Sequence, residues 1–375
     1  MLKRLRPLII KEFRQIRRDK RSLGVLLALP AFLVLLIGYA LNFDVKHIPV
    51  VMFDQDKTQT SRDFLRSFSN SEYFDLKYNV RSYDEIDKLF SQAEVLIALV
   101  IPSDFARRIY SGQDASVQVL IDGSNANSAT TAIGYVNGIV QNFSSTIAVK
   151  TLARYGRTIY QSIDVRPKVW YNPELRTAKF LIPGLFGFIL MLTAVISTSL
   201  SIVKEKERGT MEQMMISPLR TGEIILGKVI PYFLIALVSS VIILIVGFLL
   251  FDISVRGSFF WLYVGIMMFL LGALGQGLLI SSIAETTQVA FMVSVFSSLL
   301  PTFLLSGFVF PISSMPIVLQ VISNVAPSKF FLVIVRSVML KGAGPSAFWD
   351  QLLFLAIFTA FMLTISSLRL MKKQA

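Results

Sequence analysis

Six long runs of this sequence are apolar and carry no charged residue near their centre. Each reaches about 20 residues, which in a helix rising about 1.5 Å per residue covers a hydrocarbon core about 30 Å thick. The whole chain is only 16% charged, against about 25% in soluble domains. We therefore expect a polytopic α-helical membrane protein. The predicted transmembrane helices are Ser22–Leu41, Phe180–Val203, Val229–Phe251, Ser258–Ile283, Thr286–Ser306 and Gln351–Leu370.

The first run, Ser22–Leu41, could instead be a cleaved signal peptide. It is longer than a typical signal-peptide apolar region, and Gly38-Tyr39-Ala40 is a poor cleavage site. An uncleaved anchor is the preferred interpretation.

The apolar segment 307–338 is different, because three prolines and Lys329 cut it into pieces of about a dozen residues. Such pieces are too short to span a bilayer and suit a re-entrant hairpin or interfacial helices. A seventh span is the alternative, but an odd number of crossings would put the two basic termini on opposite sides of the membrane. Six crossings are therefore predicted.

Positive charge is concentrated beside the membrane segments. Residues 1–21 hold nine Lys or Arg and two acidic residues, whereas 42–178 hold 15 of each kind. Cytoplasmic ends of membrane helices retain positive charge, so both termini and the 204–228 loop are predicted to be cytoplasmic and 42–176 to lie outside. The membrane topology then accounts for the net charge of +13. A nucleic-acid-binding face is the weaker interpretation of this charge.

The outer block, 42–176, is long enough for a core of its own, and β-rich stretches alternate in it with helical ones. Ser82 and Glu85 have the capping-box spacing, and Gly112 suits the end of a helix. The prediction is an α/β domain with a sheet of about four strands. The expected strands are Pro49–Phe53, Phe74–Val80, Val95–Ile101 and Val117–Ile121, and the expected helices are Ser61–Ser69, Tyr83–Gln92 and Asp104–Ser111.

A further helix of this block has one apolar stripe, with residues at alternating steps of three and four. The stripe is Ile133, Val136, Val140, Phe143 and Ile147. It packs either on the domain's own sheet, the usual role, or on a partner chain.

Three carboxylates, Asp54, Asp56 and Asp122, are expected at strand ends beside turns. An acid/base or Ca²⁺ role is conceivable for them, but solvated turn residues are the favoured interpretation.

Cysteine is absent and His47 is the only histidine. Thiolate, zinc and histidine-based chemistry therefore have almost no residues to work with. We expect no catalytic residue and no metal site.

The loop after the second span is the most informative stretch. Thr210 and Gln213 have the capping-box spacing, and Pro218 ends the short helix that they predict. Met211, Met214 and Met215 share one face of it, and acidic residues surround them. A turn resting on lipid headgroups is the alternative, but acids beside an anionic leaflet would be repelled, so docking to a soluble protein is favoured.

Residues 205–213, Glu-Lys-Glu-Arg-Gly-Thr-Met-Glu-Gln, followed by Ser217-Pro218, resemble the coupling loop of ABC transporter permeases of the type-2 exporter class. Lys11–Asp19, within the predicted interface helix 1–21, resembles that family's amphipathic interface helix. Ile48–Asp56, Ile101–Phe105 and Leu120–Ser124 resemble its extracytoplasmic domain. The resemblance, closest to bacterial inner-membrane drug-export permeases, covers nearly the whole chain.

The resemblance implies a permease subunit of an ATP-driven exporter that moves a hydrophobic or amphipathic compound outward. It implies an ABC ATPase partner, a second permease subunit, identical or a sibling, and an optional periplasmic adaptor. The chain contains no Gly-x-x-x-x-Gly-Lys-Ser/Thr phosphate loop, so ATP and Mg²⁺ are expected on the partner, with no cofactor here. The residues expected to couple to the ATPase are Glu205, Glu207, Arg208, Gly209, Thr210, Met211, Glu212, Gln213 and Met214.

The re-entrant segment is expected to form an outer lid of the pathway. Gly307 beside Phe308 gives a flexible point, and Pro311 and Pro316 give rigid ones.

Two other classes of protein are weaker interpretations. A membrane-anchored receptor or scaffold does not need six spans, and a membrane enzyme would need an intramembrane acid, base or metal-ligand cluster.

Overall fold

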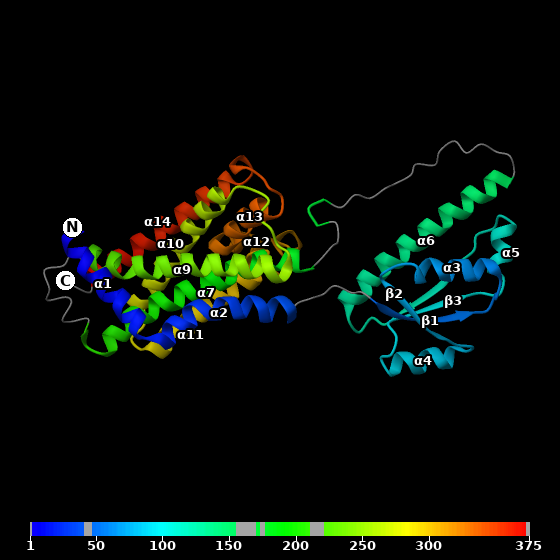
Figure 1. Cartoon of the computed structure of the whole chain (residues 1–375), viewed down its shortest axis with the longest axis horizontal. Coiled ribbons are helices and arrows are strands. Elements are labelled where there is room, and N and C mark those ends of the chain that lie inside the picture. Colours follow the sequence, from blue (N-terminus) through cyan, green and yellow to red (C-terminus); the bar gives the residue numbers. More distant parts are fainter. Residues whose placement is uncertain (1, 41–46, 155–169, 173–176, 211–220, 373–375) are drawn as a thin grey trace. The chain divides into compact units, whose positions relative to one another are not determined.

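The computed structural model describes residues 2–40, 47–154, 170–172, 177–210 and 221–372 (Figure 1). The chain divides into two compact units. The helical unit is Met1–Asn42 with Val169–Ala375, and the α/β unit is Phe43–Lys168.

The helical unit is built from long apolar helices. Its elements are α1 (Leu2–Arg18), α2 (Lys20–Ala40), α7 (Thr177–Glu207), α9 (Thr221–Phe251), α10 (Phe259–Ile283), α11 (Thr287–Leu300), α12 (Ile317–Ile322), α13 (Pro327–Met339) and α14 (Trp349–Lys372). A π-helical turn, Pro301–Leu305, continues α11. Within the described residues, α7, α9, α10, α11 with this turn, and α14 are long and apolar enough to cross a membrane.

These five helices coincide with five of the predicted spans. The first predicted span, Ser22–Leu41, corresponds to α2, which runs from Lys20 to Ala40. Two helices extend beyond the predicted spans. Helix α7 continues past Val203 to Glu207, and α9 begins at Thr221 instead of Val229. The added turns contain Glu205 and Lys228, which pair with each other and with residues of α1.

The segment after α11 is broken, as its prolines predict. The pair Ile317–Val325 and Pro327–Met339 bends by 86° at the break between them. Pro327 begins α13, where a missing backbone N–H costs nothing. The bent pair is either a broken span or a re-entrant hairpin by length and composition, so the number of crossings stays a prediction.

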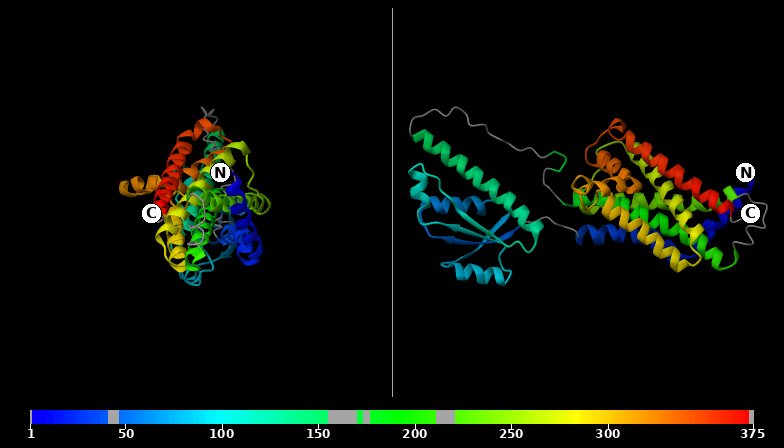
Figure 2. Two further views of the ribbon diagram at one scale, coloured as in Figure 1. Left: turned by 90° about the vertical axis from the view of Figure 1, so that its left-hand side faces the viewer. Right: turned by 180° about the vertical axis from the view of Figure 1, so that it is seen from behind.

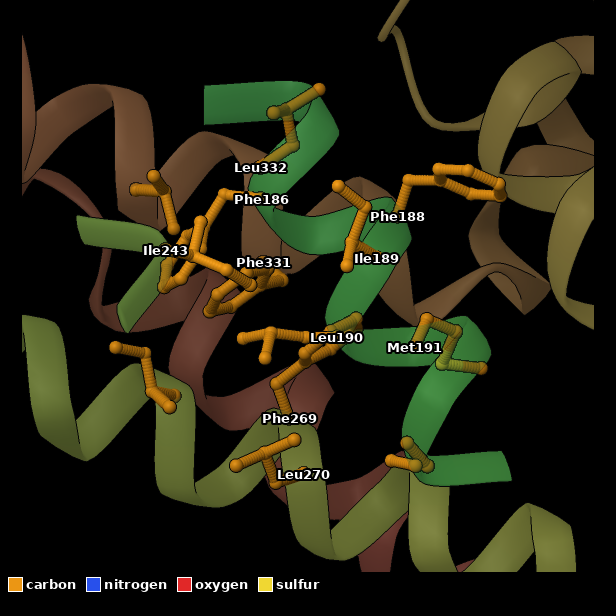
Figure 3. Packing of buried hydrophobic residues seen from close by; sticks show 14 of the residues in the cluster. Phe186, Phe188, Ile189, Leu190, Met191, Ile243, Phe269, Leu270, Phe331 and Leu332 are labelled. Carbon is orange, nitrogen blue, oxygen red and sulfur yellow. The ribbon is translucent and has the colours of Figure 1, made fainter. Parts of the chain in front are cut away.

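Helices α7 and α10 form the centre of the helical unit. The most apolar 18-residue windows of α7 and α10 are 72% and 67% buried, against 28% or less for the other three long helices. In Figure 3, Phe331 of α13 lies between Phe186 of α7 and Phe269 of α10. The rings of Phe269 and Phe331 stack 4.1 Å apart at 5°. The second half of the broken segment is thus packed into the core.

The α/β unit has a four-stranded sheet of order β2-β1-β3-β4. Strand β1 pairs in parallel with β2 and β3, and β4 runs antiparallel to β3. These strands and helices agree with the sequence prediction to within a few residues. Their bounds are β1 (Ile48–Asp54), α3 (Gln59–Ser69), β2 (Phe74–Asn79), α4 (Tyr83–Ser91), β3 (Ile97–Ile101), α5 (Phe105–Tyr110), β4 (Gln118–Ile121) and α6 (Ala126–Arg154).

Side chains alternate between the two faces of the sheet. On one face, Val50 and Leu99 pack with residues of α3, α5 and α6, and on the other, Val51 and Val100 pack with α4. Figures 1 and 2 show α6 crossing the face that α3 also covers. The predicted capping residue Ser82 accepts a hydrogen bond from the amide of Glu85.

Helix α6 packs on the domain's own sheet, which was the favoured interpretation of its stripe. Val136 is buried, and the ring of Phe143 lies 5.0 Å from that of Phe64 of α3. Ile133 was wrongly placed on the packed face, because it is 46% exposed and Ala132 is buried in its place. A small residue fits where the helix approaches the sheet, so the apolar pattern alone misplaced the face.

Candidate functional site: the charged end of helix α7

Three consecutive residues at the end of α7 bind three different neighbours. Successive residues of an α-helix point about 100° apart, so Glu205, Lys206 and Glu207 face in different directions. Each of these side chains finds a partner on another helix. The end of α7 is thereby attached to α1, α9, α10 and α11.

Glu205 lies in a buried charge cluster with two lysines and a second glutamate. Its Oε2 is 2.7 Å from Lys228 Nζ of α9, an ion pair without hydrogen-bond geometry, and its Oε1 accepts a hydrogen bond from Lys11 Nζ of α1 at 3.1 Å. Lys228 Nζ also donates to Glu12 Oε1 of α1 at 3.1 Å and to Ser201 Oγ of α7 at 3.4 Å.

The cluster is balanced, and three of its members are shielded from solvent, whereas the Lys11 side chain at its edge is 47% exposed. The side chains of Glu12 and Lys228 are each 1% exposed and that of Glu205 is 5% exposed. Two positive and two negative groups offset one another, which is the condition under which buried charge is tolerated. Because the four residues come from α1, α7 and α9, the cluster fixes the ends of three helices together.

Lys206 and Glu207 join the same helix end to the turn between α10 and α11. Lys206 Nζ donates to the backbone oxygens of Ser281 and Ala284, at the end of α10. Glu207 Oε1 accepts from the Thr287 amide at 2.6 Å and from its hydroxyl at 3.2 Å, at the start of α11. A cation near helix C-terminal carbonyls and a carboxylate near helix N-terminal amides are both favourable placements.

Helix α7 ends by a left-handed glycine. Gly209 has φ +67° and its amide donates to the backbone oxygen of Lys206 at 3.0 Å. The Thr210 hydroxyl donates to the backbone oxygen of Glu205 at 3.2 Å. Only glycine adopts this conformation without strain, so Gly209 sets the direction in which the chain leaves the helix.

The predicted coupling residues divide into three groups. Glu205 and Glu207 pair with residues of their own chain instead of presenting free carboxylates, while Arg208 is exposed. Met211, Glu212, Gln213 and Met214 lie outside the described residues. The contribution of all of them to coupling stays a prediction.

Sequence reasoning missed Lys228, Lys206 and Glu12 as parts of this site. Lys228 stands directly before an apolar span, and Glu12 is an isolated acid in a strongly basic helix. Charged residues in such positions are expensive unless paired, and that signal could have marked both. Their pairing across 216 positions of sequence required the fold.

The predicted lid residues are tightly packed. Gly307 has φ +78°, and its backbone oxygen accepts from Arg336 Nη1 of α13 at 3.0 Å. Phe308 is fully buried against Gly184 of α7, where a β-carbon would overlap its ring. Pro311 and Pro316 stand before a short 3₁₀ turn and α12 respectively. In this structure the expected flexible point is therefore held from two sides.

The carboxylates of the α/β unit stabilise turns. Asp54 accepts hydrogen bonds from the amides of Asp56 and Lys57 and from the Ser61 hydroxyl. The Ser124 amide donates to Asp122 and lowers the pKa of that carboxyl below its usual value. No group of three or more metal-binding side chains occurs among the described residues.

The fold and the site together define a polytopic membrane protein with a charged, multiply anchored helix end and a separate α/β unit. The sequence pattern of the ABC-2 family transporter proteins matches residues 20–368. The "Probable multidrug ABC transporter permease YbhR" of Escherichia coli (strain K12) is 31% identical over 360 residues, covering 96% of each chain. YbhS of the same strain, with the same description, is 32% identical over 354 residues, 94% of this chain and 93% of that protein.

The "Inner membrane transport permease YhhJ" of that strain is 26% identical over 369 residues, 97% of this chain and 96% of that protein. The chain belongs to the ABC-2 family of transporter proteins. It is a membrane permease subunit of an ABC exporter, and the receptor or scaffold alternative is not favoured. Permeases of this family work with an ABC ATPase and usually dimerise.

Proposed function

We propose that the chain exports a hydrophobic or amphipathic compound across a bacterial inner membrane, driven by a separate ABC ATPase that docks on residues 204–220. ATP and Mg²⁺ would bind only to that partner, and both termini of the permease would face the cytoplasm. The relatives named as multidrug permeases support this class of substrate.

The observation that carries the proposal is the anchored end of α7. A displacement of the segment after Gly209 would be transmitted through three side chains. Glu205 would transmit it to α1 and α9, Lys206 to α10 and Glu207 to α11. Packed and ion-paired elements move together because separating them would leave buried charges without partners. One contact of the ATPase would thus move several helices at once.

The rest of the assembly follows from the class of protein. A second permease subunit, identical or a sibling, would complete the pathway, with six crossings per subunit and the α/β unit outside. A periplasmic adaptor would dock on that unit. The charge distribution supports this orientation, because the Lys and Arg residues gather at the predicted cytoplasmic ends.

The direction of the chain after α7 offers the test. Gly209→Val forces a branched side chain into a left-handed conformation, at a cost of about 1–3 kcal/mol, and redirects the docking segment. Gly112→Val is the matched control, because Gly112 has φ +70° in the α/β unit and neither glycine has an atom within 4 Å of a built β-carbon. The tagged full chain is purified in mild detergent from cells that also produce its ABC ATPase.

We expect ATP hydrolysis in the wild-type and Gly112→Val eluates, and export by both in cells. Gly209→Val should lose most of the co-purifying ATP hydrolysis and most of the export. Absence of ATPase from the wild-type eluate, or full coupling in Gly209→Val, would contradict the proposal.

A further inference from the structure

A large cavity opens between α1 and the second half of α7. Its volume is about 1440 Å³, and Leu26 of α2 and Tyr232 of α9 contribute to its wall. Pockets for small ligands usually measure about 300–1,000 Å³, so this cavity has room for a ligand larger than a typical metabolite.

The polar part of the cavity is strongly basic. Six cationic side chains line it, against one acidic side chain, that of Asp19. The cations are Arg6, Lys11, Arg14, Arg18, Lys204 and Arg208. Within the described part of the chain, Arg14, Arg18 and Arg208 have no acidic side chain within ion-pair distance. The cavity therefore carries an excess of positive charge that an anion could neutralise.

The remaining lining is apolar and lies among the membrane helices. Ile196 and Leu200 of α7 and Leu26 of α2 face the cavity beside the cations. A free anion makes no favourable contact with such an apolar surface. An amphiphile would place its headgroup on the arginines and its chains on the apolar side chains. Basic pockets between membrane helices at the cytoplasmic side are suited to anionic lipid headgroups.

From this combination we propose that the cavity binds the phosphate headgroup of an anionic phospholipid, with the acyl chains along Ile196, Leu200 and Leu26. The inference uses the proposed orientation, which puts α1 at the cytoplasmic leaflet. Lys11 and Ser201 belong both to the cavity and to the buried charge cluster. The cavity and the cluster that holds α1 to α7 therefore share residues, and a bound lipid would stabilise the contact between these helices.

Binding to the wild-type chain is tested first. The full-length permease in neutral detergent is titrated with phosphatidylglycerol or phosphatidylcholine, and retained lipid is counted by native mass spectrometry. We expect retention of phosphatidylglycerol and at least tenfold less phosphatidylcholine. Inorganic phosphate and glycerol 3-phosphate are added as competitors. If they displace the lipid at equal concentration, the site takes free phosphate and the lipid assignment is wrong.

Matched variants locate the site. Arg14→Gln/Arg208→Gln removes two lining cations, whereas Arg17→Gln/Lys20→Gln removes two exposed cations that do not line the cavity. Each basic side chain beside an anionic headgroup contributes about fivefold in affinity. We expect about 25-fold weaker phosphatidylglycerol binding in the first variant and little change in the second. Equal losses in both would reduce the effect to net charge and overturn the proposal.

A photocrosslinking phosphatidylglycerol gives a second measurement that needs no variant. Labelled wild-type permease should yield crosslinks in peptides containing residues 6–18 and 196–208. Crosslinks confined to other helices would exclude the cavity. If Arg14→Gln/Arg208→Gln keeps its lipid but no longer co-purifies with the ATPase, the cavity is a docking site for an acidic protein segment, which also overturns the lipid proposal. Failure of the exporter proposal alone would leave lipid retention intact.

Discussion

Lys228 Nζ of α9 lies 3.1 Å from Glu12 Oε1 of α1, and both side chains are 1% exposed. The two residues come from distant parts of the chain, and both side chains are almost completely shielded from solvent. A cation left alone in such a place would be strongly unfavourable. The pair therefore makes α1 part of the helical unit and not a loosely attached surface helix.

Removing the cation at this point should destabilise the permease. In Lys228→Met, Glu12 and Glu205 lose a buried partner, which costs about 3–5 kcal/mol. Lys341→Met, at an exposed position, should change stability by less than about 0.5 kcal/mol. Thermal unfolding in detergent, followed by tryptophan fluorescence, measures both. The double variant Glu12→Leu/Lys228→Met restores charge balance and should cost less than the two single changes added together; strict additivity would show that the pair is not coupled.

Glu207 should tolerate loss of charge better than reversal of charge. Gln at this position keeps an oxygen acceptor for the Thr287 amide, whereas Lys places a cation beside the positive end of α11. Export in cells and ATPase stimulation should fall in the order wild type, Glu207→Gln, Glu207→Lys, with folding judged by size-exclusion chromatography. Equal activity of the Lys and Gln variants would remove this contact from the coupling path.

The native chain lacks cysteine, so single cysteines report orientation directly. Ser69→Cys, on an exposed position of α3, should react with a membrane-impermeant maleimide in cells with an intact inner membrane. Arg208→Cys should react only after that membrane is opened. The reverse pattern would invert the topology.

State-dependent labelling tests the lid. Val309 and Leu319 are 37% and 41% exposed. Cysteines at these positions should change their labelling rate from outside when the ATPase is trapped with nucleotide, while Ser69→Cys should not. Equal rates in every state, or labelling from the cytoplasm alone, would refute the lid.

The contact between Gly184 and Phe308 should keep the lid closed. A methyl group at position 184 overlaps the Phe308 ring, and overpacking of this kind costs about 1–3 kcal/mol. In Gly184→Ala we expect faster labelling of Val309→Cys in the resting state. Gly247→Ala is the control, because a β-carbon there lies at an ordinary 3.7 Å from Ile182 Cγ2. Unchanged labelling in Gly184→Ala would mean that Phe308 does not hold the lid.

Local signals in the sequence were sufficient for much of the fold. Uncharged runs predicted five of the long helices, and β-rich stretches predicted all four strands, because both depend on patterns within about 20 residues. The Pro-rich segment was correctly expected to break. Its tight packing was not, because the fit of Phe308 on Gly184 depends on two residues far apart in sequence.

The candidate site was harder to predict. Acidic residues after an apolar run are typical of a loop that binds a partner protein. A single sequence cannot show that Lys228 and Lys11 of the same chain neutralise Glu205. The helix boundary moved for the same reason. Long-range pairing holds the charged last turn of α7, and the left-handed Gly209 ends the helix.

Helix α7 carries both the contact with Phe308 and the charge cluster around Glu205. Near its start, the Phe180 backbone oxygen accepts from Arg336 at 3.4 Å and Gly184 receives Phe308, and about 38 Å away along the axis stands Glu205. If the segment around Phe308 acts as the predicted lid, a compound that favours one position of the lid should also favour one position of this helix. By thermodynamic reciprocity it then changes the affinity for the ATPase by the same factor by which the ATPase changes the affinity for the compound. Substrate binding at the outer end should therefore be measurable as a shift in the dissociation constant of a protein bound at the inner end.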